Sequence, residues 1–286
     1  MGRRDGIKVK VGAMQKLQVR LMPKRCDSDC YINQKVDVTE LVDYLEKYNK
    51  KNKNEKITYF HAFSTAIAKV IYNRPLLNRF IINKKYYDRN EVSLAFAAKV
   101  SFNDKSKEIL SVIKVAEDDN VLALSEKIRS RVDKIRSKSS DLGDTDKAME
   151  FLAKLPGPIL SFLVWVIKRL DNHDMLPSSV TRDSLYHSTM ILSNVGAIGG
   201  GALYHHLTDF GTSSILMTMG KIYKQKVIGD DGKSSVRSFC DFGITLDERI
   251  ADGFYFIKSF KYFEEIMKKP ELLFEEVSRK VELDEE

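Results

Sequence analysis

One stretch near the C-terminus constrains the fold most, because a strand pattern there runs directly into a helix pattern. Apolar residues alternate before the junction and recur at helical spacing after it: Cys240, Phe242, Ile244 and Leu246, then Phe256, Phe260, Phe263 and Met267. Between the two patterns lies the charged turn DERIADG, residues 247–253. Such a turn sits where two elements meet, so we predict that its side chains face a ligand.

The composition indicates an ordinary folded protein. The chain has 286 residues, of which 43% are hydrophobic and 30% charged, enough for a substantial core in one large domain or two small ones. Its three cysteines, Cys26, Cys30 and Cys240, include no second ligand pair, so we expect no metal site and a reduced, cytoplasmic location. The first ten residues contain no apolar run, so no secretory signal is predicted.

The net charge of +7 is concentrated in the first quarter of the chain. A basic surface attracts nucleic acid, anionic lipid or a phosphate-bearing cofactor, although a solvated surface is the simpler interpretation. The chain has no zinc-finger spacing, RNP-like motif or basic heptads, so we expect no nucleic-acid partner. Residues 1–28 are predicted to be a basic, irregular arm.

Local patterns predict alternating strands and helices along the rest of the chain. Thr39 is the expected N-cap of the first helix, and Pro75 the residue that stops the second. The predicted strands cover residues 30–38, two short runs on either side of Asn83-Lys84, residues 94–100, 109–115, 189–194 and 214–221, and a segment 227–246 that folds back at residues 229–232. The predicted helices cover residues 40–48, 60–71 and 121–136, a helical excursion within 137–186, and two helices starting at Gly253 and Pro270. Strands and helices do not alternate regularly as βαβ units, which favours an α+β layered sheet over a doubly wound one. Residues 29–286 are predicted to form one domain.

The longest apolar run, within PGPILSFLVWVIKRL, is too short to span a bilayer and contains Pro156, Gly157 and Pro158. We therefore predict no membrane span. A helix packed over the sheet is the favoured interpretation. The alternative is a surface that contacts membranes or an apolar acceptor, because the run ends in Lys168 and Arg169.

Several motifs occur in an order that resembles one known superfamily. In chain order they are KVDVTEL, the helix ITYFHAFSTAIAKVIYNRPLLN, the strand VSLAFAAKV, Ser-Asn-Val-Gly at 193–196, DERIADG, and Lys-Pro-Glu-Leu-Leu at 269–273. Together they resemble the chloramphenicol acetyltransferase superfamily, which includes the dihydrolipoamide acyltransferase catalytic domains of 2-oxoacid dehydrogenase complexes. The resemblance implies a two-layer sandwich with a mixed sheet and helices on one face. It also implies a homotrimer with active sites between subunits, and acyl transfer from coenzyme A to a thiol or hydroxyl of a small acceptor.

The same resemblance implies roles for individual residues. Ser193 matches the serine whose hydroxyl stabilises the tetrahedral oxyanion, with Asn194 and Gly196 beside it and Gly253 at the other motif as cofactor-binding positions. Without the resemblance, Ser193 is a turn residue bonding its own backbone. Asp252 matches an aspartate that pairs with an arginine and holds the catalytic loop. Arg20, Arg25 and Arg249 are the candidate arginines. Asp252 also suits the N-terminus of a helix, and both interpretations can hold together.

The position of the family's catalytic histidine is occupied by Glu248. A glutamate with a pKa of about 4.3 is a far weaker base than an imidazole near 6.5. Burial or the carboxylates of Asp247 and Asp252 would have to raise its pKa, whereas Arg249 would lower it. Three hypotheses follow: Glu248 is a tuned base, another histidine has replaced it, or acyl transfer is slow or lost. The candidate replacements are His205 and His206, with His187 second.

Two further expectations concern lipoyl chemistry and activity. Asp146-Lys147-Ala148 spells the tripeptide that carries lipoyl groups, but it precedes a predicted helix and has no small β domain around it, so we expect no covalent lipoyl group. We see no lipoyl or subunit-binding domain and expect a free-standing catalytic-type domain. The predicted function is coenzyme A-dependent acyl transfer. The alternative is a catalytically impaired relative that binds coenzyme A or assists assembly.

Overall fold

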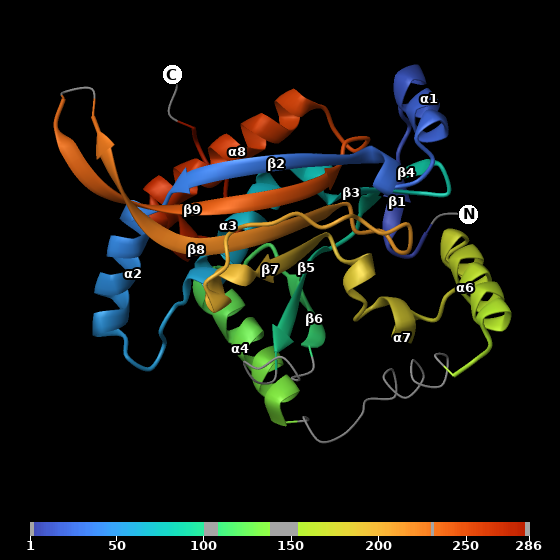
Figure 1. Ribbon diagram of the computed structural model, residues 1–286, viewed down its shortest axis with the longest axis horizontal. Coiled ribbons are helices and arrows are strands. Elements are labelled where there is room, and N and C mark those ends of the chain that lie inside the picture. Colours follow the sequence, from blue (N-terminus) through green and yellow to red (C-terminus); the bar gives the residue numbers. More distant parts are fainter. Residues whose placement is uncertain (1–2, 100–107, 138–153, 230–231, 284–286) are drawn as a thin grey trace.

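Six strands form the central sheet of the computed structural model, which describes residues 3–99, 108–137, 154–229 and 232–283 (Figure 1). The strand order is β2-β9-β8-β7-β5-β6. The strands are β2 (Asp29–Asp37), β5 (Val92–Lys99), β6 (Glu108–Val115), β7 (Met190–Asn194), β8 (Ile215–Ile228) and β9 (Ser234–Asp247). β7 runs parallel to β5 and β8, and the other neighbours are antiparallel, so the sheet is mixed. The predicted α+β fold class is confirmed.

β2 is an edge strand and pairs with β9, so the sheet joins an early and a late part of the chain. Asp29 lies opposite Asp247, and Asp37 lies opposite Phe239. The register places Cys30 beside Leu246, with both side chains on the helical side of the sheet. β8 extends seven residues beyond the predicted end, because its outer half pairs with β9 in a long hairpin.

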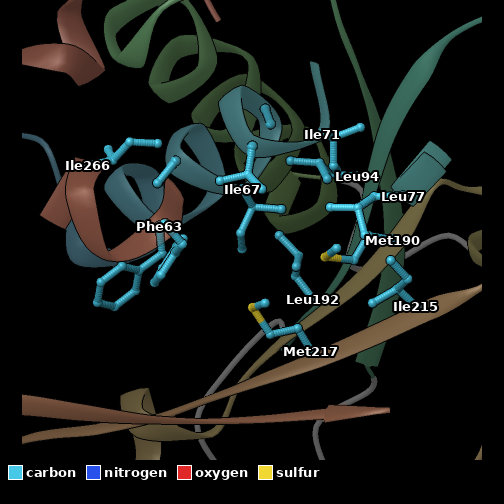
Figure 2. Packing of buried hydrophobic residues seen from close by; sticks show 14 of the residues in the cluster. Phe63, Ile67, Ile71, Leu77, Leu94, Met190, Leu192, Ile215, Met217 and Ile266 are labelled. Carbon is cyan, nitrogen blue, oxygen red and sulfur yellow. The ribbon is translucent and has the colours of Figure 1, made fainter. Parts of the chain in front are cut away.

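Four helices lie against one face of the sheet and bury the main core. They are α2 (Thr39–Lys51), α3 (Tyr59–Asn73), α4 (Val121–Ser137) and α8 (Gly253–Lys268). Figure 2 shows Ile67 of α3 pointing toward Leu192 of β7, whereas Phe63 packs against Phe242 of β9 and Phe263 of α8. Burying such a side chain contributes roughly 1.5–3 kcal/mol, so this cluster is the main source of stability. An apolar cavity of about 40 Å³ lies within it, between α3, α8 and the sheet.

Side-chain caps mark the starts of some helices and not of others. α3 begins with a capping box, in which the Thr58 hydroxyl accepts from His61 N and His61 Nδ1 accepts from Thr58 N. The predicted N-cap of α2 was wrong, because Val38 holds that position. The Thr39 hydroxyl instead donates to Asp37 and accepts from Ser238 N of β9. The element starting at Pro270 is a single 3-10 turn, η5 (Pro270–Phe274).

The segment before β2 is not irregular, contrary to expectation. It contains β1 (Gly6–Lys8) and α1 (Ala13–Leu21). β1 joins β4 (Lys85–Arg89), which forms a hairpin with β3 (Arg79–Ile82), and these three strands make a second, small sheet. Asn83 and Lys84, the predicted turn between the two short strands, both have positive φ, at 50° and 58°. Positive φ at both central residues is typical of a type I′ hairpin turn.

The helix α6 (Gly157–Asn172) does not cover the sheet, so the prediction of a packed helix was wrong. Only Asp171 of its residues is buried, and in Figure 1 the helix stands apart from the layers. It is followed by the short α7 (Ser178–Thr181). Within the described ranges, no helix is long and apolar enough to cross a bilayer.

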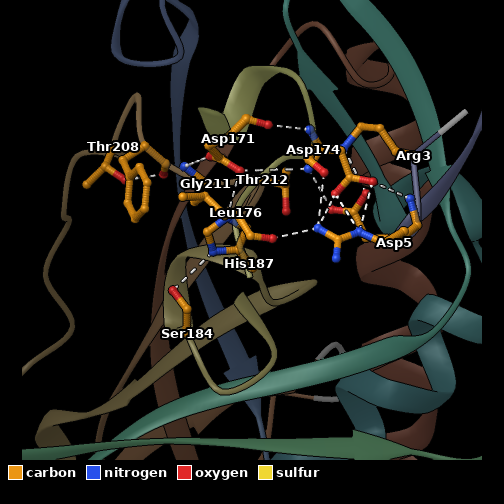
Figure 3. A network of polar contacts seen from close by, with 12 residues as sticks. Arg3, Asp5, Asp171, Asp174, Leu176, Ser184, His187, Thr208, Gly211 and Thr212 are labelled. Carbon is orange, nitrogen blue, oxygen red and sulfur yellow. Dashed lines mark hydrogen bonds and ion pairs between the residues drawn. The ribbon is translucent and has the colours of Figure 1, made fainter. Parts of the chain in front are cut away.

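A polar network fastens the end of α6 to the rest of the protein (Figure 3). Arg3 donates to the carbonyl of Asp171 at 2.7 Å, and Asp171 accepts from Gly211 N at 3.1 Å. His187 lies 3.1 Å from both Asp171 and Ser184, in the turn η3 (Leu185–His187). His187 is buried within this network, so we assign it a structural role there.

Candidate functional site

Ser193 lies near the end of β7, on the sheet face opposite the main helices. Its parallel neighbour across β8 is Thr218, whereas Leu192 and Met217, one residue back, point into the core. Asn194 follows as the N-cap of η4 (Val195–Ile198), and its side-chain oxygen accepts from Ala197 N at 3.1 Å. The half-buried Ser193 hydroxyl is therefore presented at a strand end beside a tight turn, as an oxyanion donor requires.

Gly196 holds this turn against the sheet. A Cβ at this position would collide with the carbonyl group of Gly220 in β8. Gly199 closes the turn with φ at 80°, a value that favours glycine. The structural role of Gly196 is thus close packing, and its predicted role in binding coenzyme A stays a prediction.

The segment 199–213 crosses the same face of the sheet after this turn. Leu203 N donates to the Thr218 hydroxyl at 3.0 Å, and that hydroxyl donates back to the Leu203 carbonyl. In β9, Gly243 lies so close to the Leu203 carbonyl that a side chain there would collide with it. The segment therefore runs directly over β8 and β9 and carries His205 and His206 toward β2.

His206 is held by a carboxylate at the start of β2. Its Nδ1 lies 3.0 Å from Asp29 Oδ2 and 2.9 Å from the Tyr31 hydroxyl. The His206 side chain is 79% exposed, whereas that of Asp29 is 3% exposed. Burial raises the pKa of Asp29, and its hydrogen bond with His206 opposes that rise. Because a carboxylate only accepts, Asp29 favours the tautomer with the proton on Nδ1, which leaves the unprotonated Nε2 able to act as a base.

The two histidines next to each other have different surroundings. His205 is exposed, and the residue before it, Tyr204, packs edge-on against Tyr31 with ring centroids 5.5 Å apart. His206 makes a similar edge contact with Tyr31 at 6.0 Å. Of the two candidates, only His206 has a carboxylate to orient it. This is the arrangement that general bases commonly use.

Glu248 lies just past the end of β9 and is exposed. Its backbone N donates to the Ser28 carbonyl at 3.0 Å, so the chain position is firmly held. Burial, with a smaller contribution from the negative charge of Glu248, raises the pKa of the Cys30 thiol. Glu248 is exposed, so a single chain does not provide the burial that a tuned carboxylate base would need.

Asp247, and not Asp252, binds the arginines. Its carboxylate is fully buried and accepts two bonds from Arg249, each 2.7 Å long, while Arg25 Nε lies 3.9 Å away. Arg25 also donates to the carbonyls of Thr208, Ile81 and Gly211. Two of the three arginines proposed for Asp252 thus serve Asp247, and the third, Arg20, donates to the Lys16 carbonyl. Sequence reasoning missed this pairing.

Asp252 caps the helix α8 instead. Its side chain accepts from Tyr255 N at 2.8 Å and is exposed, and Gly253 is the first helical residue. This matches the simpler of the two interpretations given above, in which a carboxylate stabilises the N-terminus of a helix.

Ser193 and the Glu248–His206 region do not meet within one chain. Ser193, Thr218, Gly243 and Asn33 form one row across β7, β8, β9 and β2. Asp29 lies four residues along β2 from that row, about 13 Å, and three strands across, about 14 Å. Groups that act on one reacting atom lie about 3–3.5 Å from it, so one chain alone does not assemble a complete site from these residues.

At the end of the sheet that carries Asp29, three polar side-chain atoms are buried without a hydrogen-bond partner in the described part of the protein. They are Asp29 Oδ1, Thr245 Oγ1 and Ser214 Oγ. Thr245 lies opposite Tyr31, and Ser214 accepts from Asp247 N through its backbone carbonyl. Buried polar groups ordinarily find a partner in the protein or in ordered water. Among the described residues, no group of three or more His, Cys, Asp or Glu side chains is arranged to hold a metal ion.

Comparison with known proteins identifies the family. The profile described as “2-oxoacid dehydrogenases acyltransferase (catalytic domain)” matches residues 5–149 and 168–275. The chain belongs to this acyltransferase family. A curated relative, the lipoamide acyltransferase component of the branched-chain alpha-keto acid dehydrogenase complex of Bacillus subtilis, is 20% identical over 221 residues. That alignment covers 76% of this chain and 41% of the relative, so the chain spans less than half of that protein's length.

Solved structures of this acyltransferase superfamily share the fold. A probable dihydrolipoamide acetyltransferase from Listeria monocytogenes has a TM-score of 0.59 at 19% identity, covering 92% of this chain and 94% of the other. The cubic core of a pyruvate dehydrogenase multienzyme complex has a TM-score of 0.61 at 15% identity, covering 93% of each. A chloramphenicol acetyltransferase has a TM-score of 0.54 at 13% identity, covering 92% of this chain and all (100%) of the other. The predicted superfamily and its two-layer fold are confirmed. The tripeptide Asp146-Lys147-Ala148, on which the prediction about a lipoyl group rests, lies outside the described residues.

Proposed function

We propose that this protein transfers an acyl group from coenzyme A to a thiol or hydroxyl of a small acceptor, with His206 as the base. The observation that carries the proposal is the Asp29–His206 pair, which lies on the same sheet face as Ser193 in a member of the acyltransferase family. A histidine oriented by a carboxylate supplies the base that Glu248 does not.

The proposed reaction has two steps. His206 Nε2 takes the proton of the acceptor, and the acceptor sulfur or oxygen attacks the thioester carbonyl carbon. The Ser193 hydroxyl donates to the resulting oxyanion. When the tetrahedral intermediate collapses, the carbon–sulfur bond to coenzyme A breaks, the acyl group stays on the acceptor, and the coenzyme A thiolate takes the proton back from His206.

A complete site in this proposal needs two subunits. Within one chain Ser193 lies roughly 19 Å from Asp29, estimated from strand spacing. We propose that Ser193 of one protomer faces the His206 region of another in a homotrimer. The acceptor would bind at that boundary.

The test follows acyl transfer from acetyl-CoA to a panel of acceptors, including dihydrolipoamide, by chromatographic separation of acetyl-CoA from coenzyme A. We expect Ser193→Ala to lower kcat by about 10²–10³ fold and His206→Ala by about 10²–10⁴ fold. Asp29→Asn should lower kcat as well, because it removes the group that orients His206. The matched control is His205→Gln, which should leave the rate unchanged.

Two results would redirect the proposal. If Glu248→Gln abolishes turnover and His206→Ala does not, the carboxylate is the base. If neither the protein nor a Glu248→His variant transfers acetyl groups, the alternative of a binding protein is favoured. Calorimetric titration with acetyl-CoA then separates a protein that binds without turnover from one that does not bind.

A further inference from the structure

The helix α6 exposes side chains that a folded domain ordinarily buries. Of its 16 residues only Asp171 is buried. Phe162 and Trp165 are each 61% exposed, and their rings stack with centroids 6.0 Å apart. A helix that is apolar nearly all round is normally covered by protein or by lipid. The exposed side of α6 therefore points to a partner.

The outward side of α6 combines aromatic rings with positive charge. Leu160, Leu163 and Ile167 are half-buried on one side of the helix. Phe162 and Trp165 occupy the other side, and Lys168 and Arg169 follow one turn later, both exposed. No acidic residue occurs between Gly157 and Leu170. Aromatic rings at the level of lipid headgroups, with cations beside them, are typical of helices that lie in a membrane interface.

The helix is anchored firmly at one end. Arg3 and Gly211 both bind Asp171, and Arg4 donates to the carboxylate of Asp174 and to the Leu176 carbonyl (Figure 3). These contacts tie the N-terminal segment to the end of α6. Arg4 is paired with Asp174, whereas Lys8 and Lys10 further along that segment are exposed.

The family match leaves this helix unexplained. It stops at residue 149 and resumes at 168, so most of α6 lies outside the part that the family profile shares. We propose that α6 docks the protein on an anionic lipid surface, with Phe162 and Trp165 at the level of the upper acyl chains and Lys168 and Arg169 on headgroup phosphates. A second copy of α6 carries the same positive charge and offers no acid to meet it between residues 157 and 170, which favours lipid. The inference is independent of the proposed function.

Trp165 provides a direct probe, since it is the only tryptophan of the chain. We would titrate the full chain with vesicles of phosphatidylcholine, with and without phosphatidylglycerol, and record tryptophan emission together with vesicle flotation. Docking predicts a blue shift and co-flotation with the phosphatidylglycerol vesicles. Both should weaken as the salt concentration rises, because screening reduces the attraction of exposed charges.

Variants separate the apolar and the charged contributions. Phe162→Ser should weaken partitioning by more than about tenfold, because it removes a large apolar side chain. Lys168→Gln and Arg169→Gln should each weaken it by about fivefold on anionic vesicles, and hardly at all on phosphatidylcholine. The control is Ile228→Ser, at an equally exposed apolar position at the end of β8, which should bind like the unaltered protein.

Two outcomes overturn the proposal. In the first, the emission stays that of a water-exposed tryptophan and the protein stays with the solution at every vesicle composition. In the second, the emission shifts to the blue without lipid as the protein concentration rises, and Phe162→Ser abolishes that shift. This second result would show that another copy of the chain covers α6.

Discussion

Three neighbouring charged residues at the end of β9, Asp247 to Arg249, have different environments, and this difference governs what each can do. Asp247 and Arg249 are buried and bind each other through two hydrogen bonds, while Glu248 between them is exposed. An isolated buried charge is costly, so loss of one partner leaves the other uncompensated. The Asp247–Arg249 pair therefore stabilises the loop, and a substitution of the exposed Glu248 should not disturb it.

We predict that the Asp247–Arg249 pair tolerates no one-sided change. Asp247→Asn should lower the free energy of unfolding by roughly 3–5 kcal/mol, since it leaves Arg249 and Arg25 without their carboxylate. Glu248→Gln should change it by less than about 0.5 kcal/mol, because the side chain is exposed. Urea unfolding of both variants measures the difference. Equal effects would show that the pair contributes no more than a surface residue.

His61 should make the stability of the protein depend on pH. Burial, aided by Arg129, lowers its pKa from 6.5 to about 4 in the folded state. The unfolded chain therefore takes up the proton first as the pH falls, so stability is lost between about pH 6.5 and 4, by roughly 3 kcal/mol. Above about pH 7.5, a unit past the unfolded pKa, its titration no longer changes the stability.

The variant His61→Gln tests this, because glutamine preserves the capping contact at the start of α3 without titrating. Stability measured from pH 7 to 4 should fall less steeply than in the unaltered protein. His173→Gln, at an exposed position, should leave the slope unchanged. Carboxylates titrate over part of this range, so the comparison uses the difference between variants. Parallel curves for both variants would contradict the assignment.

The candidate site was partly predictable at this scale. Ser193, Glu248 and Asp252 could be placed from motif order, because each lies beside a recognisable strand end or helix start. The partner of His206 could not, since Asp29 is 177 residues away in sequence. The sequence also could not show that Asp247, and not Asp252, pairs with the arginines. Burial on the folded sheet decides which carboxylate needs a counter-charge.

At the level of elements, the turn η4 that follows β7 depends on close backbone contact. We predict that Gly196→Ala lowers the free energy of unfolding by about 1–3 kcal/mol, since the added methyl group collides with the backbone of Gly220. Gly253→Ala is the matched control. Its Cβ has open space at the start of α8, so this variant should be neutral or stabilising by up to about 1 kcal/mol. Thermal unfolding compares them, and a neutral Gly196→Ala would refute the close contact.

The hairpin of β3 and β4 offers a gain in stability. Lys84 has φ at 58°, a conformation that costs a residue with a side chain about 1 kcal/mol. Lys84→Gly should therefore raise the free energy of unfolding by about that amount and produce the Asn-Gly pair that type I′ turns favour. Lys85→Gly, one residue further and within β4, should lower it. Chemical unfolding of both variants checks the sign.

Local patterns predicted the elements whose neighbours are close in sequence. β2, α3, α8 and the β3–β4 turn lie where alternation, helical spacing and caps placed them. The length of β8 and the pairing of β1 with β4 were missed, because distant strands decide them. The exposure of α6 was also missed, since an apolar run alone does not reveal whether the domain buries it.

At the scale of the whole molecule, Ser193 lies far from the His206 region within one chain. The proposed activity therefore requires an assembly of at least two subunits. We predict that Ser193→Ala and His206→Ala chains, each inactive alone, regain activity when co-expressed. If each site takes one residue from each of two neighbouring subunits, about a quarter of the sites in random hybrids carry both intact residues. Mixing the separately purified variants without subunit exchange is the control. Hybrids no more active than either variant would place the site within one chain.

The C-terminal segment is part of the core rather than an appendage. Lys69 of α3 is fully buried and donates to the Glu276 carbonyl at 2.7 Å, and Val277 and Val281 are buried beside it. Helices from the first third of the chain are thus completed by residues from its last part.

This arrangement has a consequence for biosynthesis. β2 leaves the ribosome long before β9, which is its neighbour in the described sheet and is translated about two hundred residues later. Until then β2 is unpaired, and its exposed edge can associate with other nascent chains. The pairing of β2 must wait until β9 has been translated, so we expect newly made chains to depend on chaperones that shield this strand during translation.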